Sequence, residues 1–185
     1  MAPRRMVDVS DAVLVIVDMQ EAFRKAIPDH ALITSRIAMA VRGFRILDVP
    51  VVVTEQYPKG LGRTVEELML TLPDGFEPIE KSTFSAFGEP KFADVLATAE
   101  RKQIILCGIE THVCVNQTAH DLLGNGYEVH LLTDCVASRF EADKAAGLQK
   151  MIASGAIASS VEMALFEAMR DSKHEKFRDV QAQIK

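Results

Sequence analysis

The sequence predicts an α/β fold: a single-domain, three-layer α/β/α structure around a doubly wound, six-stranded, mainly parallel sheet. Three observations predict this class. Short apolar runs alternate along the chain with segments whose apolar residues recur at helical spacing. The run at 13–17 is continuous and mostly β-branched, which is typical of parallel strands buried on both faces. The length of 185 residues suits one domain, which we expect to span residues 1–185.

The individual elements follow from local patterns. Short apolar runs predict strands at 13–17, 51–53, 76–80, 104–108, 129–133 and 156–158. The third of these contains Pro78, which cannot donate to a sheet ladder and indicates an edge strand. Apolar residues three and four positions apart predict helices at 31–47, 65–70, 92–101, 113–123, 141–153, 161–169 and 173–184. Pro50 follows the first helix and Gly124 the fourth, as expected of helix ends.

Composition narrows the classes of partner. The net charge is −5, and the longest basic cluster is Arg4 with Arg5, so we expect no nucleic acid to bind. The apolar run at 12–17 is too short to cross a membrane or to form a secretion signal. The three cysteines are odd in number and form no closely spaced pair. We therefore expect a cytoplasmic protein in a reducing compartment, with no membrane partner.

Three polar residues follow predicted strands. Asp18 comes after the first strand, Lys81 after the third, and Cys114 at the start of the helix after the fourth. Ligands of doubly wound folds bind at this carboxyl edge of the sheet. A helix N-terminus and a lysine both favour a thiolate, and an aspartate can accept the thiol proton. The alternative for each residue alone is structural: a capping aspartate, a solvated lysine and a core cysteine.

Four local sequence motifs are more specific than the positions of single residues. The chain reads VDMQEAF at 17–23, KSTFSAF at 81–87, CGIETHVCV at 107–115 and TDCVAS at 133–138. In this order they resemble the isochorismatase-like cysteine hydrolases, and the likeness covers nearly the whole chain. The resemblance implies a catalytic triad of Asp18, Lys81 and Cys114. It also implies a cis peptide between Ile109 and Glu110, with the backbone N–H groups of Glu110 and Cys114 forming an oxyanion hole.

The resemblance implies acyl transfer on a small-molecule substrate. Asp18 would take the proton of Cys114, and the thiolate would attack a carbonyl carbon of an amide-type C–N bond. Lys81 would hold the ion pair, and water would hydrolyse the resulting thioester.

The loop after the second strand departs from the metal-binding relatives. Nicotinamidases of the family carry Asp and His there, whereas residues 54–62 read TEQYPKGLG and contain neither. We therefore expect no metal and no cofactor. The loop and the tail at 177–181 resemble the isochorismatase-domain-containing subfamily, and the family likeness implies a homo-oligomer, either a dimer or a tetramer.

Further residues are candidates for binding the substrate. Gln20 lies two positions after Asp18, so along a strand the two would share a face, and Gln20 could fix the carboxylate. The loop position of Tyr57 would let it cover the site. His112 would face solvent or a partner subunit. The full set of substrate-binding candidates is Gln20, Phe23, Tyr57, Phe84 and Phe87, and the phenylalanines have packing in the core as their alternative.

Several functions stay open at this point. A non-enzymatic or redox-sensing protein would use Cys114 as a reactive thiol, but would not need a dedicated proton acceptor. Vinyl-ether hydrolysis of the isochorismatase type is done by family members that lack the cysteine. Nuclease activity is disfavoured by the acidic net charge.

Overall fold

The computed structural model describes residues 6–184, and Arg4 and Arg5 lie outside that range. One sheet with strand order β3-β2-β1-β4-β5-β6 runs through the molecule, and every neighbouring pair is parallel. The α/β/α prediction is confirmed, and the sheet is wholly rather than mainly parallel. The strands are β1 (Ala12–Val17), β2 (Val51–Gln56), β3 (Ile79–Lys81), β4 (Gln103–Ile109), β5 (Glu128–Ala137) and β6 (Ile157–Ser159).

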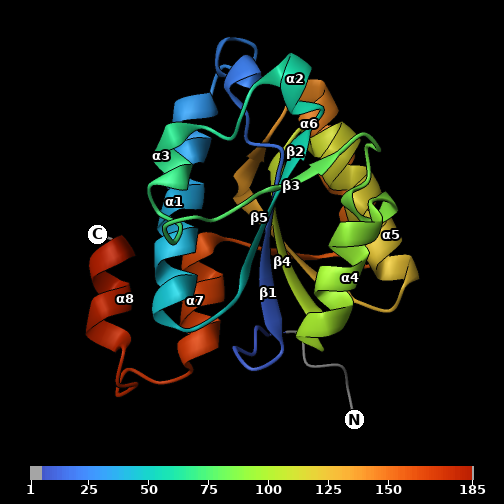
Figure 1. Cartoon of the computed structure of the whole chain (residues 1–185). Helices are drawn as coiled ribbons and strands as arrows, with labels where there is room; N and C mark the ends of the chain where they lie inside the picture. Colours follow the sequence, from blue (N-terminus) through green and yellow to red (C-terminus); the bar gives the residue numbers. More distant parts are fainter. Residues whose placement is uncertain (1–5, 185) are drawn as a thin grey trace.

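Helices cover both faces of this sheet (Figure 1). One layer holds α1 (His30–Ile46), α3 (Glu66–Met69), α7 (Val161–Met169) and α8 (Phe177–Ile184). The other holds α4 (Pro90–Ala99), α5 (Asn116–Gly124) and α6 (Glu141–Ala153). Short turns complete the chain: η1 (Glu21–Lys25), α2 (Pro58–Leu61), η2 (Ala86–Gly88) and the π-helical turn η3 (Thr111–Val115).

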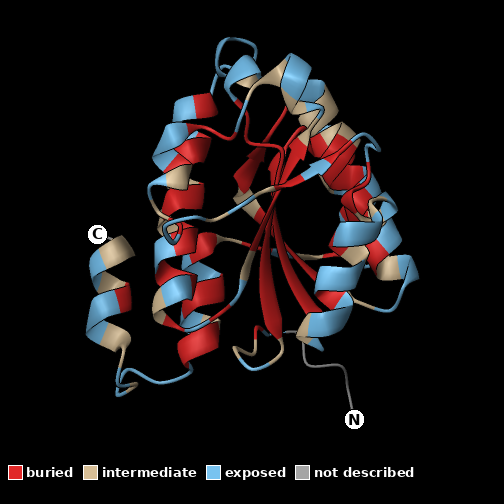
Figure 2. Ribbon diagram, viewed as in Figure 1, coloured by how far each residue is buried: buried red, intermediate tan, exposed pale blue. Residues whose placement is uncertain are grey.

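The central strand β1 shows why helices must cover both faces of the sheet. Its side chains alternate between two apolar clusters: Leu14 and Ile16 pack on the α1 side, and Val13, Val15 and Val17 pack on the α4–α5 side. Every residue of β1 is buried, as Figure 2 shows for the whole middle of the sheet. A continuous apolar run is therefore the pattern that a strand in this position requires.

Three elements differ from the predicted ones. The third strand begins only at Ile79, because Pro78 supplies no N–H, and it does form an edge of the sheet. The predicted helix at 65–70 is a single turn, α3. The predicted strand at 129–133 continues to Ala137, because β5 bulges against β4: Leu106 pairs with Leu131, but Gly108 pairs with Val136.

Gly108 marks a close approach of β4 to β1 directly before Asp18. Its φ is +118°, a region that side chains rarely adopt. A Cβ at this position would lie 2.1 Å from the carbonyl oxygen of Val17 and 2.6 Å from its nitrogen. Since both neighbours are backbone atoms of a central strand, they cannot move aside. The position therefore requires glycine.

We predict that Gly108→Ala lowers the free energy of unfolding by at least about 3 kcal/mol, because it combines a backbone clash with an unfavourable φ. Urea unfolding followed by circular dichroism measures this. The matched control is Gly124→Ala in α5, where a Cβ meets nothing within 4 Å and alanine favours the helix. Equal stability of the two variants would contradict the prediction.

Candidate functional site

Asp18 is the first residue after β1 and leaves the strand in a left-handed conformation, with φ 53°. Aspartate tolerates this region better than most residues. The turn directs its buried carboxylate towards the end of β2, where the Thr54 hydroxyl donates a hydrogen bond of 2.7 Å to Oδ1. The Asp18 backbone N–H also donates to the Thr54 carbonyl at 3.1 Å. One oxygen of the carboxylate is therefore fixed by the neighbouring strand.

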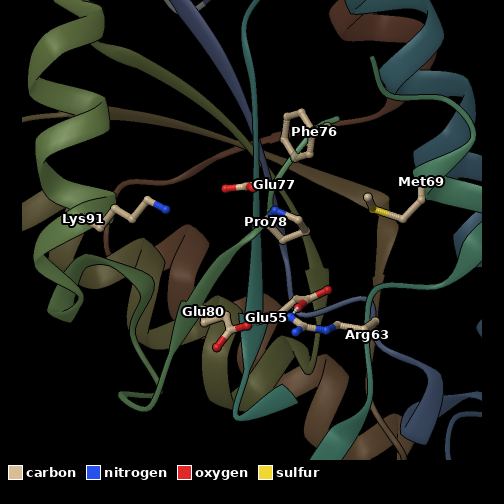
Figure 3. A pocket seen from close by; sticks show the side chains of 8 residues that line it. All are labelled: Glu55, Arg63, Met69, Phe76, Glu77, Pro78, Glu80 and Lys91. Carbon is tan, nitrogen blue, oxygen red and sulfur yellow. Dashed lines mark hydrogen bonds and ion pairs between the residues drawn. The ribbon is translucent and has the colours of Figure 1, made fainter. Parts of the chain in front are cut away.

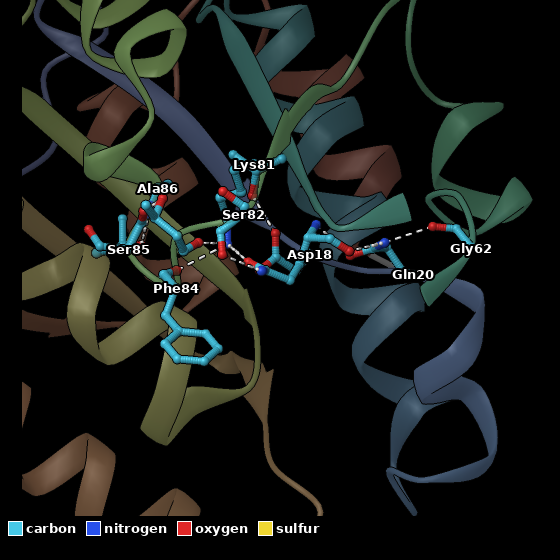
Figure 4. A network of polar contacts seen from close by, with 12 residues as sticks. Asp18, Gln20, Gly62, Lys81, Ser82, Phe84, Ser85 and Ala86 are labelled. Carbon is cyan, nitrogen blue, oxygen red and sulfur yellow. Dashed lines mark hydrogen bonds and ion pairs between the residues drawn. The ribbon is translucent and has the colours of Figure 1, made fainter. Parts of the chain in front are cut away.

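The second oxygen of Asp18 is held by Lys81, the last residue of β3. The Lys81 ammonium donates to Oδ2 at 2.8 Å, and both side chains are essentially inaccessible, at 0% for Lys81 and 1% for Asp18. The ammonium also lies 2.6 Å from Oε1 of Gln56, 3.1 Å from the Thr83 carbonyl and 3.0 Å from the Phe84 carbonyl. Figure 4 shows this polar network at the ends of the strands. A buried ion pair with such complete hydrogen bonding avoids the cost of an unpaired buried charge.

Cys114 lies in η3, which follows β4 and continues directly into α5. It is buried, with 8% of the residue exposed. Burial raises the pKa of the Cys114 thiol to about 12, and the negative charge of Asp18 and a hydrogen bond between the two side chains contribute to the rise. The positive charge of Lys81 opposes it. The structure thus brings the three residues Asp18, Lys81 and Cys114 together.

The pKa of the Cys114 thiol is raised although two features of the sequence favour a thiolate. The sequence shows the helix start and the lysine, which both favour a thiolate, but not the depth of burial or the nearness of the Asp18 carboxylate. With a pKa of about 12, the thiol is protonated at neutral pH. A thiolate would form by passing the proton to a neighbouring base, and Asp18 is close enough for its charge to raise the pKa of the thiol.

Glu110 begins the segment that carries Cys114. The peptide bond between Ile109 and Glu110 is cis, as the family resemblance implies. The Glu110 carboxylate is buried and accepts hydrogen bonds from the backbone N–H of Arg139, at 3.1 Å, and from its Nε, at 3.0 Å. The chain after β5 is thereby tied to the chain after β4.

Gln20 does not follow the strand register that we expected. Since β1 ends at Val17 and Asp18 turns away, the Gln20 side chain does not meet the Asp18 carboxylate. Its amide instead clamps the end of β2: Oε1 accepts from the backbone N–H of Gln56 at 2.8 Å, and Nε2 donates to the carbonyls of Gln56 and Gly62 at 3.0 and 2.7 Å. Gln20 is fully buried.

The aromatic candidates have different environments. Phe23 packs partly buried against the core on the α1 side, and Phe87 packs against the other core and lies edge-on to Tyr127. Tyr57 and Phe84 are exposed, at 59% and 56%. Phe84 is tied to the site through its carbonyl, which accepts from Lys81. Tyr57 lines a shallow pocket of about 300 Å³ beside the main chain of β3.

His112 lies near Cys114 in η3 and pairs with neighbours of the same chain. Its Nδ1 is 3.0 Å from the Ser138 hydroxyl, and its Nε2 is 3.9 Å from a carboxylate oxygen of Asp143. Its side chain is 25% exposed.

A larger pocket, of about 620 Å³, lies apart from this site (Figure 3). Glu55 and Glu80 line it, from β2 and β3, and Arg63 pairs with both at 2.9 and 2.6 Å. Successive residues of a strand point to opposite faces, so Glu55 faces away from the site that Thr54 and Gln56 face. The size of the pocket therefore does not identify the candidate site.

Within residues 6–184, no cluster of three or more His, Cys, Asp or Glu side chains is arranged to hold a metal ion. In the same range, no helix combines the length and apolar character needed to cross a membrane.

Three residues around the site are not among the predicted ones: Thr54 and Gln56, which bind Asp18 and Lys81, and Arg139, which binds Glu110. The alternation of β2 could have identified the first two, because the strand after Asp18 in the chain is its neighbour in the sheet and positions two apart share a face. Arg139 carries no comparable signal, since its contact with Glu110 depends on the bulged end of β5.

Comparison with known proteins identifies the family. A family model of the isochorismatase domain matches residues 12–163. Isochorismatase domain-containing protein 2 of Danio rerio is 39% identical over 170 residues, which cover 92% of this chain and 85% of that protein. Protein 1 of the same species is 41% identical over 169 residues, covering 91% of this chain and 59% of that protein. A solved structure described as the MAR1 ribonuclease from Caenorhabditis elegans has a TM-score of 0.92 and 36% identity, covering 97% of this chain and 92% of that one. The chain belongs to the isochorismatase domain family.

Proposed function

We propose that this family member is a cysteine hydrolase that cleaves the amide-type C–N bond of a small molecule through a thioester on Cys114. The observation that carries the proposal is the buried ion pair of Asp18 and Lys81, with Cys114 close enough for the Asp18 charge to raise and the Lys81 charge to lower the pKa of its thiol. A base, a cation and a nucleophile near one another form the general arrangement for covalent catalysis.

The reaction follows from these contacts. The S–H bond of Cys114 breaks, its proton moves to Asp18, and the sulfur electron pair attacks the substrate carbonyl carbon. The backbone N–H groups of Glu110 and Cys114 stabilise the oxyanion of the tetrahedral intermediate. Asp18 then returns the proton to the nitrogen as the C–N bond breaks. Water hydrolyses the thioester, which releases the carboxylic acid and restores the thiol.

The exposed rings of Tyr57 and Phe84 support a role at the mouth of the site, since each is next to a residue or carbonyl that binds Lys81. We assign Phe23 and Phe87 to the walls behind them, where both already pack against core. Gln20 would act on the substrate only indirectly, through the end of β2.

Two other functions are less well supported. A redox sensor needs a thiolate at neutral pH, whereas the pKa of Cys114 is raised to about 12. Ribonuclease activity, named for the C. elegans relative, would bring RNA to a chain with a net charge of −5.

We further propose that the protein works as a cytoplasmic homo-oligomer, a dimer or a tetramer, with no cofactor. Exposed apolar side chains such as Leu70, Phe140 and Met163 provide surface that a second copy could cover.

We predict that Cys114→Ala reduces turnover of any amide substrate by at least about a thousandfold, because the covalent step is lost. Ammonia release from a panel of small primary amides measures this, with an RNA substrate assayed alongside. The matched control is Cys107→Ala. This variant removes a fully buried thiol of β4 that contacts the Val15 carbonyl of β1, and it should keep turnover. Full activity in Cys114→Ala, or cleavage of the RNA alone, would sink the proposal.

Asp18→Asn separates the reactivity of the Cys114 thiol from the turnover of an amide substrate. Because the Asp18 charge raises the pKa of Cys114, we predict that the neutral variant reacts with iodoacetamide at least about tenfold faster near pH 8. Amide turnover falls at the same time, because the proton has no acceptor to carry it to the leaving nitrogen. In the wild type, the alkylation rate should rise through the alkaline range without levelling off.

Peptide mass spectrometry assigns the alkylation to Cys114 rather than to the fully buried Cys107 and Cys135. Slower alkylation in Asp18→Asn would contradict the assigned cause of the raised pKa.

A further inference from the structure

The Lys81 ammonium has more acceptors than it has protons. It carries three N–H groups. Four oxygens lie within hydrogen-bonding distance: Oδ2 of Asp18 at 2.8 Å, Oε1 of Gln56 at 2.6 Å, and the carbonyls of Thr83 and Phe84 at 3.1 and 3.0 Å. Only one of the four is charged. The other three are neutral carbonyl oxygens, one for each N–H.

This surplus matters when the proton moves. In the resting site the carboxylate of Asp18 balances the charge of Lys81. When Asp18 takes the thiol proton, it becomes a neutral acid, and its attraction for the ammonium weakens. A buried ammonium without hydrogen bonds is costly. The three neutral acceptors can satisfy every N–H in this state, so Lys81 need not move while the thiolate exists.

Among the three neutral acceptors of Lys81, only Gln56 uses a side-chain oxygen. Its orientation is fixed, because Nε2 donates to the Ser82 carbonyl at 2.8 Å and thereby turns Oε1 towards Lys81. Its backbone is fixed as well, since Gln20 binds both its N–H and its carbonyl. Figure 4 shows Gln20, Asp18 and Lys81 in this one network. Gln56 is thus held in place without any help from Asp18.

We propose that Gln56 is a positioning residue for the reaction: with the carbonyls of Thr83 and Phe84, it keeps the Lys81 ammonium charged and in place beside the thiolate while Asp18 holds the proton. The inference rests on the proposed function. It implies that Gln56 contributes little while Asp18 is ionised, because Lys81 then keeps three acceptors without it. The contribution of Gln56 appears once Asp18 is neutral.

The test uses Asp18→Asn as a stable mimic of the neutral acid, with iodoacetamide as the probe and Cys114 alkylation as the readout. Asp18→Asn should react at least about tenfold faster than wild type near pH 8, since Lys81 remains charged beside the thiol. Adding Gln56→Leu should reverse most of this gain, by about tenfold. The Thr54 hydroxyl keeps the amide oxygen of the Asp18→Asn side chain on its side, so the amide NH2 faces Lys81 and one ammonium N–H is left without an acceptor. Gln56→Leu alone should also react more slowly than wild type, because the wild-type thiolate forms when Asp18 takes the proton and Lys81 then relies on the neutral acceptors.

The matched control is Asp18→Asn with Gln183→Leu, which removes an amide on α8 that binds Arg42. This variant should keep the fast alkylation. Urea unfolding of the wild type, both single variants and the double variant serves as a second readout: a loss of stability in the double variant larger than the sum of the single losses supports the shared acceptor set, and an additive loss counts against it.

Three results would overturn the inference. One is fast alkylation in the Asp18→Asn, Gln56→Leu variant, another is no acceleration in Asp18→Asn, and the third is unfolding of Gln56→Leu alone. Alkylation needs no amide turnover, so these results stand apart from the activity of Cys114→Ala, which tests the proposed function itself.

Discussion

The buried ion pair between Asp18 and Lys81 is the interaction on which the site depends. Removing both charges from water is costly, and their attraction offsets the cost only with good geometry and further hydrogen bonds. The chain supplies these from three places: the hydroxyl of Thr54, the amide of Gln56 and two carbonyls of the loop after β3. The ends of β1, β2 and β3 are thereby fixed relative to one another. Cys114 is then brought to this pair by β4, the other neighbour of β1.

Alternation along β2 separates the side of the sheet that holds the ion pair from the opposite side. In β2, Thr54 and Gln56 face the ion pair, while Glu55 between them points the other way. There Glu55 is buried and accepts from the N–H and hydroxyl of Thr64, at 2.7 and 2.8 Å. This contact holds the loop that lies next to Gln20. A carboxylate on the far face therefore helps to position the amide clamp that fixes the near face.

Sequence reasoning could predict the sheet because the buried strands read as apolar runs, and β1 and β4 are buried along their whole length. It was weakest at β3, where only three residues pair and Pro78 precedes them. That Asp18, Lys81 and Cys114 form one candidate site was predictable from their positions after strands and from the family's sequence motifs. The raised pKa of Cys114 was not predictable, because it depends on burial and on the nearby Asp18 charge, which no local pattern contains. Gln20 was misjudged for a related reason: the left-handed turn at Asp18 breaks the strand register.

A thiol that rests protonated changes where the catalytic effect must arise. A site that stabilised the thiolate fully in the resting state would gain nothing when the substrate reacts, because catalysis needs interactions that strengthen in the transition state. In the proposed reaction, the Asp18 charge opposes the thiolate before the proton moves and disappears as the proton arrives, whereas the Lys81 charge persists. The same proton transfer thus removes the unfavourable charge and leaves the favourable one beside the developing sulfur anion. The neutral carbonyls around Lys81 make that change possible without any movement of the buried cation.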